Sequence, residues 1–240
     1  PWLPYKGYWL STMLLVCLLA IMVFARGKEK GFKARYKLAK STIGWKHKLA
    51  MVLLLLSSVS AGAYIYYNTR VLNEYMTPKE AEELRVAFEK KYKKYEKVLQ
   101  PRIVATKTDV DIFPSERRVN VKGFYYLKNK HARAIDTLFI NYNGGEKSYY
   151  HYKQLQPSVA ATLLENDQKF GVKLFRLAQP LQPGDSIRFD FDMSYQPVGF
   201  QNNGTETEVV YNGTFFNSMT FPAIGYNPAS ELSANAARVK

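Results

Sequence analysis

Two long runs without charged side chains occupy most of the first 67 residues, at positions 8–25 and 49–67. As α-helices, which rise about 1.5 Å per residue, these runs would be about 27–29 Å long, close to the hydrocarbon thickness of a bilayer. Neither run has the polar stripe that marks the solvent-facing side of a helix in a soluble protein. The pattern therefore predicts two transmembrane helices. A buried helical hairpin in a soluble protein is the alternative.

Residues 77–97 have the spacing of a short amphipathic helix. Apolar side chains recur there at steps of three and four, at Leu84, Phe88, Tyr92 and Tyr95. The helix should begin at the sequence TPKE, which supplies a capping residue, a proline at the first helical position and a glutamate that completes a capping box. We expect residues 68–100 to form a helical stalk that packs on the domain that follows it or on membrane-side partners. A free, solvated helix is the alternative.

From Pro101 onward the apolar positions change to a period of two. The stretch DSIRFDFDMSY alternates throughout, as a half-buried strand does. Further strands are predicted in RIVATKTDVDIFP, VNVKGFYYLKN, AIDTLFINY, KSYYHYKQL, KFGVKLFRLA and TEVVYNG, separated by turn sequences such as NGG, QPGD and NNG. Short strands with no helix between them predict an all-β antiparallel sandwich over residues 101–240.

The segment between the two apolar runs, residues 26–48, is dense in basic side chains and contains one acid, Glu29. Short loops rich in Lys and Arg stay on the cytoplasmic side of a membrane. We therefore read 26–48 as a basic cytoplasmic loop, which places the β domain on the opposite side. The residues that carry this topology signal are Arg26, Lys28, Lys30, Lys33, Arg35, Lys37, Lys40, Lys46 and Lys48.

The net charge of +14 could also indicate nucleic-acid binding. The first 67 residues hold ten Lys or Arg and one acid, or +9, and the remaining 173 hold 24 and 19, or +5. Most of the excess therefore lies beside the predicted membrane spans, and we expect no nucleic-acid partner. The lone cysteine, Cys17, falls in the first apolar run, so no disulfide can form within the chain. An exported domain without disulfides suits a bacterial envelope protein.

Candidate chemistry is sparse. Asp109 with Asp111, and Asp190 with Asp192, are carboxylate pairs that would share a strand face, where they could bind a cation or simply face solvent. The histidines are His47, His131 and His151, and none belongs to an H-E-x-x-H motif or to a zinc-like cluster. The sequence also contains no G-x-S-x-G. The two N-G-T triplets, at Asn203 and Asn212, are read as turns rather than glycosylation sites.

Three segments in order, LQPGDSIRFDF, VVYNGTFFN and FPAIGYNPASEL, resemble the N-terminal β domain of zinc aminopeptidases of the aminopeptidase N type. The stretches IYYNTRVLNEYMT, FEKKYKKYE and PRIVATKTDVDIFP are similar to a narrower group, the bacterial membrane proteins that join an ABC transporter permease to such a peptidase. The resemblance covers nearly the whole chain.

The resemblance implies a downstream catalytic domain that holds zinc through H-E-x-x-H and a later glutamate, so no zinc ligand or catalytic residue is expected within these residues. It also implies a bacterial inner-membrane location, with the β domain on the periplasmic side. The lipid bilayer, the downstream peptidase domain and other transmembrane helices would be partners, and peptides would be candidate ligands. By analogy, the residues that border the substrate cleft would be Asn212, Gly213, Thr214, Phe215, Phe216 and Tyr226. A turn and core aromatic residues are the structural alternative for this set, and a non-enzymatic binding module or accessory transporter domain is the alternative function.

Overall fold

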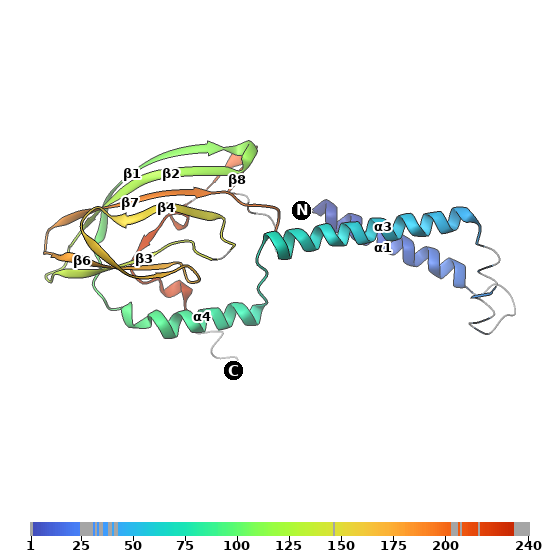
Figure 1. Ribbon diagram of the computed structural model, residues 1–240, viewed down its shortest axis with the longest axis horizontal. Coiled ribbons are helices and arrows are strands. Elements are labelled where there is room, and N and C mark those ends of the chain that lie inside the picture. The colour runs from blue at the N-terminus through green and yellow to red at the C-terminus, as the bar shows by residue number, and fades with distance from the viewer. Residues whose placement is uncertain are drawn as a thin grey trace. The chain divides into compact units, whose positions relative to one another are not determined.

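The structure of the protein is a computed structural model that describes residues 2–24, 31, 33, 36–37, 40, 43–145, 147–202, 206, 208–215 and 217–232. The chain divides into two compact units. The helical unit comprises residues 1–74 together with 199–205, and the β unit comprises residues 75–198 together with 206–240. Figure 1 shows the elements of both.

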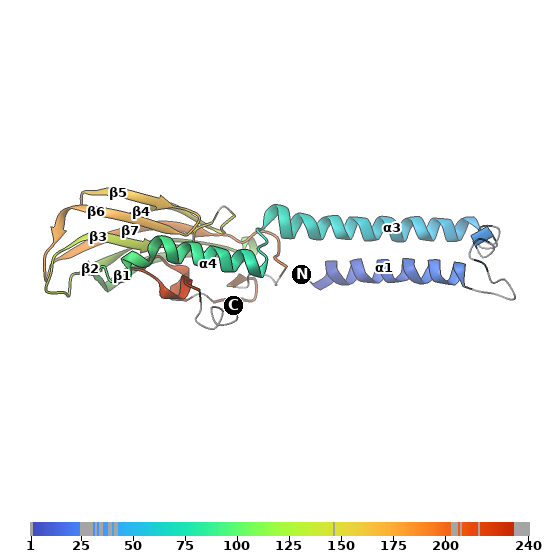
Figure 2. The same cartoon turned by 90° about the horizontal axis from the view of Figure 1, so that it is seen from below.

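Two apolar helices form the body of the helical unit. Helix α1 (Trp2–Val23) and helix α3 (Trp45–Tyr66) lie side by side, as Figure 2 shows. A hydrogen bond of 2.6 Å joins the hydroxyls of Thr12 and Ser58 across the pair. No residue of α3 is buried, and Leu55, in the middle of the helix, is 52% exposed. Both helices are long and apolar enough to cross a membrane.

Both helices begin before the uncharged runs from which they were predicted. Helix α3 begins at Trp45, so Lys46 and Lys48 lie in its first turn rather than in a loop. Charged side chains mark where the hydrocarbon layer would end, whereas the backbone ladder of a helix continues past that point. Of the other basic positions, Lys33, Lys37 and Lys40 are exposed. The remaining four, Arg26, Lys28, Lys30 and Arg35, lie outside the described residues.

A later part of the chain joins the helical unit through Phe200. Its ring lies 5.9 Å from the ring of Tyr5 on α1 and 5.9 Å from that of Tyr64 on α3. The preceding residue, Gly199, has φ +59°, and a Cβ there would lie 2.5 Å from the Asn68 side-chain oxygen. Glycine is favoured at that position, because a side chain there would be strained and would require the Asn68 side chain to shift.

The expected amphipathic helix is present as α4 (Pro78–Tyr92), followed by a 3₁₀ turn (Lys93–Tyr95). Its capping box is formed, with the Thr77 hydroxyl accepting from the Glu80 N–H at 3.2 Å and the Glu80 carboxylate accepting from the Thr77 N–H at 2.7 Å. Phe88 and Tyr92 are buried against a β-sheet of the same unit. The helix thus packs on the domain that follows it, one of the two arrangements expected from its apolar stripe.

The rest of the β unit is built from antiparallel sheets. The first sheet has the order β1–β2–β7–β4 and the second has the order β10–β3–β6–β5. The strands of the first sheet are β1 (Arg102–Phe113), β2 (Arg118–Lys128), β4 (Tyr150–Pro157) and β7 (Ser186–Tyr195). Those of the second are β3 (Ile135–Asn141), β5 (Ala161–Asp167), β6 (Val172–Leu181) and β10 (Ala223–Ile224). A small hairpin, β8 (Val209–Val210) with β9 (Gly213–Thr214), completes the unit.

One hydrophobic core contains side chains from both four-stranded sheets. Strand β7 buries every second residue from Ile187 to Tyr195, as its alternation predicts. Strand β5 was not predicted, because a bulge between Leu163 and Glu165 interrupts its period and both Leu163 and Leu164 are exposed. Apolar alternation therefore predicts the regular strand β7 but not the bulged strand β5.

Candidate functional site

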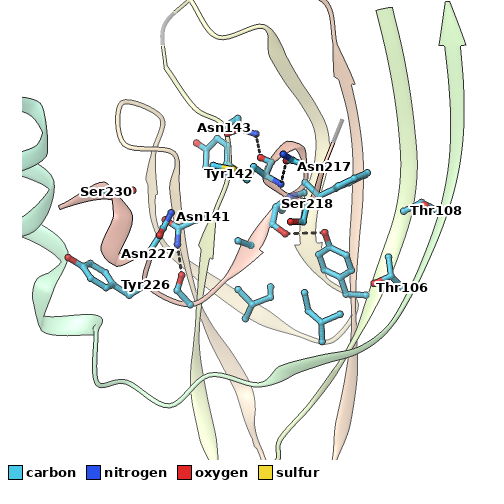
Figure 3. A pocket seen from close by; sticks show the side chains of 18 of the residues that line it. Thr106, Thr108, Asn141, Tyr142, Asn143, Asn217, Ser218, Tyr226, Asn227 and Ser230 are labelled. Atoms are coloured by element: carbon cyan, nitrogen blue, oxygen red, sulfur yellow. Dashed lines mark hydrogen bonds between the residues drawn. The ribbon is translucent and has the colours of Figure 1, made fainter. Parts of the chain in front are cut away.

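A groove of about 930 Å³ opens beside the inner face of strand β1. Figure 3 shows it between the first strands of the first sheet and the segment around β10. Ile103, Thr106 and Thr108 of β1 line one wall, and Asn141 is among the residues lining the opposite wall. Strand β10, at the edge of the second sheet and among the residues that line the groove, has only two residues.

Side-chain amides and a phenol hold the wall formed by residues 217–230. The Asn143 amide donates to the Met219 carbonyl oxygen at 2.9 Å, and the Tyr125 hydroxyl donates to that of Pro222 at 3.0 Å. The Asn141 amide donates to the carbonyl oxygen of Gly225. These bonds reach a segment with little regular secondary structure of its own, so strands β2 and β3 fix its position.

None of the nineteen residues that line the groove is Lys, Arg, His, Asp or Glu, although 22% of the chain is charged. The hydroxyls of Thr106, Thr108, Ser218 and Ser230 have no hydrogen-bond partner among the residues that the structure describes. Apolar side chains such as Ile103 lie next to them. The groove can therefore hydrogen-bond an uncharged polar ligand, such as a peptide backbone, but offers no charged group for acid–base or metal chemistry.

The residues that the sequence placed at a cleft separate into two groups. Tyr226 lines the groove, but its hydroxyl donates to Glu231 at 2.8 Å and its ring stacks on Phe88 at 5.4 Å. Burial and the nearby Glu231 carboxylate raise the pKa of Tyr226. The others are exposed, lie in or beside the β8–β9 hairpin, and do not line the groove: Asn212, Gly213, Thr214 and Phe215. Phe216 lies outside the described residues.

Sequence reasoning missed most of the groove wall, including Thr106, Asn141, Asn143 and Asn217. Strand β1 has polar side chains on both faces, so alternation alone did not show that Thr106 and Thr108 point inward. A usable signal was present in the sequence NYN, where Asn141 and Asn143 end a buried strand at a spacing of two. Amides at such a place usually hold a neighbouring loop.

The carboxylate pairs lie on the outer face of the first sheet, away from the groove. Lys122 on β2 stands in register between Asp109 on β1 and Asp192 on β7. The Arg188 guanidinium lies 2.6 Å from the Asp190 carboxylate. Within the described part of the chain, no three His, Cys, Asp or Glu side chains are grouped closely enough to hold a metal ion. Asp109 and Asp111 are exposed, as the solvated-face interpretation expects, whereas Asp190 and Asp192 are half-buried and Asp190 has Arg188 as its ion-pair partner.

The histidines of the β unit are not brought together either. One ring nitrogen of His131 lies 3.1 Å from the Gln100 carbonyl oxygen, a contact that fixes the loop before β3. His151 pairs in register with Ser194 on the outer face of the first sheet. His47 belongs to α3 in the other unit.

An ionic cluster fastens α4 to the edge of the second sheet. The Tyr92 hydroxyl donates to Glu165 and to Asp167, each at 2.8 Å. The Lys91 ammonium lies 2.6 Å from Glu165 and 2.5 Å from Asp167. Burial opposes ionisation of Asp167, but the hydrogen bonds from Lys91 and Tyr92 outweigh it and lower the pKa of Asp167. Hydrogen bonds to Asp167 and Glu165 raise the pKa of Lys91. The role of this cluster is structural, because it attaches α4 to strand β5.

A second pair of acids lies close to Arg117. Burial, followed by the negative charge of Glu208, raises the pKa of Glu206 above its ordinary value, and Arg117 partly offsets the shift. The Tyr195 hydroxyl donates to Glu208 at 2.9 Å. Glu206 is thus held beside a second carboxylate, a situation that favours its protonated form.

We expect Glu206→Gln to stabilise the β unit at neutral pH. A raised pKa means that the folded state binds the proton more tightly than the unfolded state, so this group's contribution to stability falls as pH rises above 4.5 toward its folded-state pKa. The advantage of the glutamine variant should therefore be complete above the folded-state pKa of Glu206, shrink as pH falls below that pKa, and disappear below 4.5. Urea titrations of both proteins at several pH values measure it.

The matched control for that experiment is Asp111→Asn, which removes one negative charge from an exposed position on β1. Its stability difference from the parent protein should not reproduce the pH dependence of Glu206→Gln. A glutamine variant that is less stable than the parent protein at pH 7 would show that the Glu206 carboxylate is stabilising and would contradict the expected sign.

Comparison with known proteins does not identify this chain. No family model matches the sequence, and no curated protein matches it.

Proposed function

We propose that this chain is the membrane-anchored part of a permease–aminopeptidase protein, in which an exported β-sandwich supports a downstream zinc peptidase domain. The observation that carries the proposal is the exposure of the apolar helices. Side chains such as Trp9 and Leu55 are 60% and 52% exposed on α1 and α3. Exposed apolar surface on this scale is unfavourable in water and expected in lipid.

The basic segment supports the orientation of the anchor. Residues 26–48 contain nine Lys or Arg and one acid, and they join the ends of α1 and α3. Translocation of so many cations is unfavourable, so in this proposal the segment stays in the cytoplasm and the β domain lies outside. The location is the inner membrane of a bacterium.

The supporting role of the β domain rests on the family resemblance and on the chemistry of its side chains. Apart from tyrosines, the groove contains no ionisable side chain. Among the described residues, no three His, Cys, Asp or Glu side chains lie close enough together to hold a metal ion. Hydrolysis in this proposal therefore belongs to another domain of the same protein. The β domain contributes a fixed surface beside that domain.

The test compares the 240-residue chain with the product of the full reading frame. Both are purified in detergent, their zinc content is measured, and hydrolysis of aminoacyl-coumarin amides is followed with and without a chelator. We expect zinc and chelator-sensitive hydrolysis in the full product, and neither in the short chain. A full product without zinc and without hydrolysis would contradict the peptidase assignment.

A second function is favoured by the uncharged groove itself. The β domain would then be a binding module for extended, uncharged peptide segments, with no hydrolysis. In that case the 240-residue chain alone should bind an acetylated and amidated Thr–Val repeat peptide. Ser218→Trp, which fills the groove, should abolish binding, whereas Val159→Trp, on the loop between β4 and β5, should not. Absence of binding by the short chain excludes this second function.

A further inference from the structure

Strand β1 is a long and uncovered edge of the first sheet. It pairs with β2 on one side, and no strand of the described chain pairs with its other side, as the sheet order and Figure 1 show. All twelve residues of β1 are exposed or half-buried. The strand contains no proline, and its one bulge lies near its beginning, between Ile103 and Ala105. Such an edge presents free backbone donors and acceptors to another strand.

The two faces of β1 differ in chemistry. Lys107, Asp109 and Asp111 lie on the outer face with Lys122 of β2. Neither Lys107 nor Asp109 forms an ion pair with another described residue. On the inner face, Thr106 and Thr108 line the groove. The edge thus offers unpaired charges of both signs on one face and hydroxyls on the other.

We propose that β1 pairs antiparallel with β1 of a second copy of this chain, centred on Thr108. In this register Thr108 faces its own counterpart, and each Lys107 faces Asp109 of the other copy. Two opposite-charge pairs form, and Thr106 faces Val110 on the inner side. Cross-strand pairs of this kind stabilise antiparallel strands.

Charge selects this register over its neighbours. When two copies of β1 pair around a two-fold axis and each face of the sheet stays continuous, one residue of β1 must lie opposite the same residue of the other copy. That residue is the centre of the register. Centring on Lys107 would set the two Lys107 side chains opposite each other. Centring on Asp109 would oppose the two Asp109 carboxylates, and centring on Val110 would set Asp109 opposite Asp111 twice. The register centred on Thr108 brings opposite charges together with no like-charge pair among these residues.

The paired strands would join the two first sheets into one continuous eight-stranded sheet. Because Thr106 and Thr108 line the groove, the two grooves would meet at the two-fold axis. The contact between two edge strands is smaller than the interface of a typical stable dimer, so the dimer should dissociate on dilution.

Single cysteines test the register. The full chain in detergent, with Cys17 replaced by serine, receives Thr108→Cys, Thr106→Cys or Val110→Cys, and disulfide formation is scored under mild oxidation. Directly opposed residues in an antiparallel pair have Cα atoms about 4.5–5.5 Å apart, within disulfide range, whereas residues displaced along the strand are out of range. We expect Thr108→Cys to form a dimer by itself, and Thr106→Cys to cross-link only with Val110→Cys.

Val159→Cys, on the loop between β4 and β5, measures random collision. If Thr108→Cys forms no more dimer than Val159→Cys, or if Thr106→Cys cross-links with itself, the proposed register is wrong.

Charge reversal provides a second, independent test by sedimentation. Lys107→Asp should weaken self-association about tenfold or more, because two attractive pairs become two repulsive ones. Asp109→Lys should do the same, and the double variant Lys107→Asp with Asp109→Lys should restore association. Both positions are exposed, so the fold should be unaffected. A double variant as weak as the single ones, or a parent protein that remains monomeric at the highest concentration reached, overturns the proposal.

Discussion

Tyr92→Ala is expected to lower the free energy of unfolding of the β unit by about 3–5 kcal/mol, the range for removing a large buried ring. Tyr92 has 0% exposure, and its ring contacts Phe88, Phe139 and Phe170. Its removal leaves a cavity between α4 and the second sheet. It also removes the hydroxyl that donates to two carboxylates. Urea titration of the full chain in detergent, followed by near-ultraviolet circular dichroism of tyrosine, measures the loss.

Tyr92→Phe is the matched control, because it keeps the ring and removes only the hydroxyl. Its expected cost is about 1–3 kcal/mol, since Glu165 and Asp167 then keep Lys91 as a partner but lose one donor. If the alanine and phenylalanine variants were equally stable, the packing of the ring would contribute nothing, and α4 would not be anchored through its apolar stripe.

Leu55→Arg is expected to reduce membrane insertion strongly, by placing a charge at the centre of α3. Insertion measurements assign about 2.5–3.5 kcal/mol to an arginine at the middle of a transmembrane helix. Leu55 is 52% exposed within its own unit, so the substitution disturbs little packing there. The measured quantity is the fraction of the chain that resists alkaline extraction from membranes.

Leu55→Ile controls for the change of side-chain shape and should be extracted like the parent protein. A charge on a helix that lies in water would be harmless. Equal resistance of the arginine variant and the parent protein would therefore contradict the membrane role of α3.

Much of the fold could be predicted because its elements follow periodic patterns. The capping box of α4 and the alternation of β7 are formed by residues close together in the sequence, and both were predicted. Strand β5 was missed because its bulge breaks the period of two. The packing of Phe200 on the helices could not be predicted from the sequence, since Phe200 and its partner Tyr64 are more than 130 positions apart in the chain.

The groove shows why site residues were harder to predict than strands. Its wall comes from β1, β2, β3 and the segment 217–230, and only the sheet order brings them together. The family resemblance placed the residues around Asn212 beside a substrate cleft shared with a downstream domain, and that stays a prediction. In the structure Asn212 is exposed and does not line this groove. Tyr226 was also selected from the family resemblance. It lines this groove, and its hydroxyl and ring already contact Glu231 and Phe88.

The orientation of the chain across a membrane can be measured with an impermeant thiol reagent in intact cells. Single cysteines are placed at Thr42, in the basic segment, and at Ser158, between β4 and β5, in a chain that lacks Cys17. We expect the cysteine at position 158 to be labelled and the one at position 42 to react only after the membrane is permeabilised. Labelling of both positions, of neither, or of position 42 alone in intact cells would contradict a chain that crosses the membrane twice and exports its β unit.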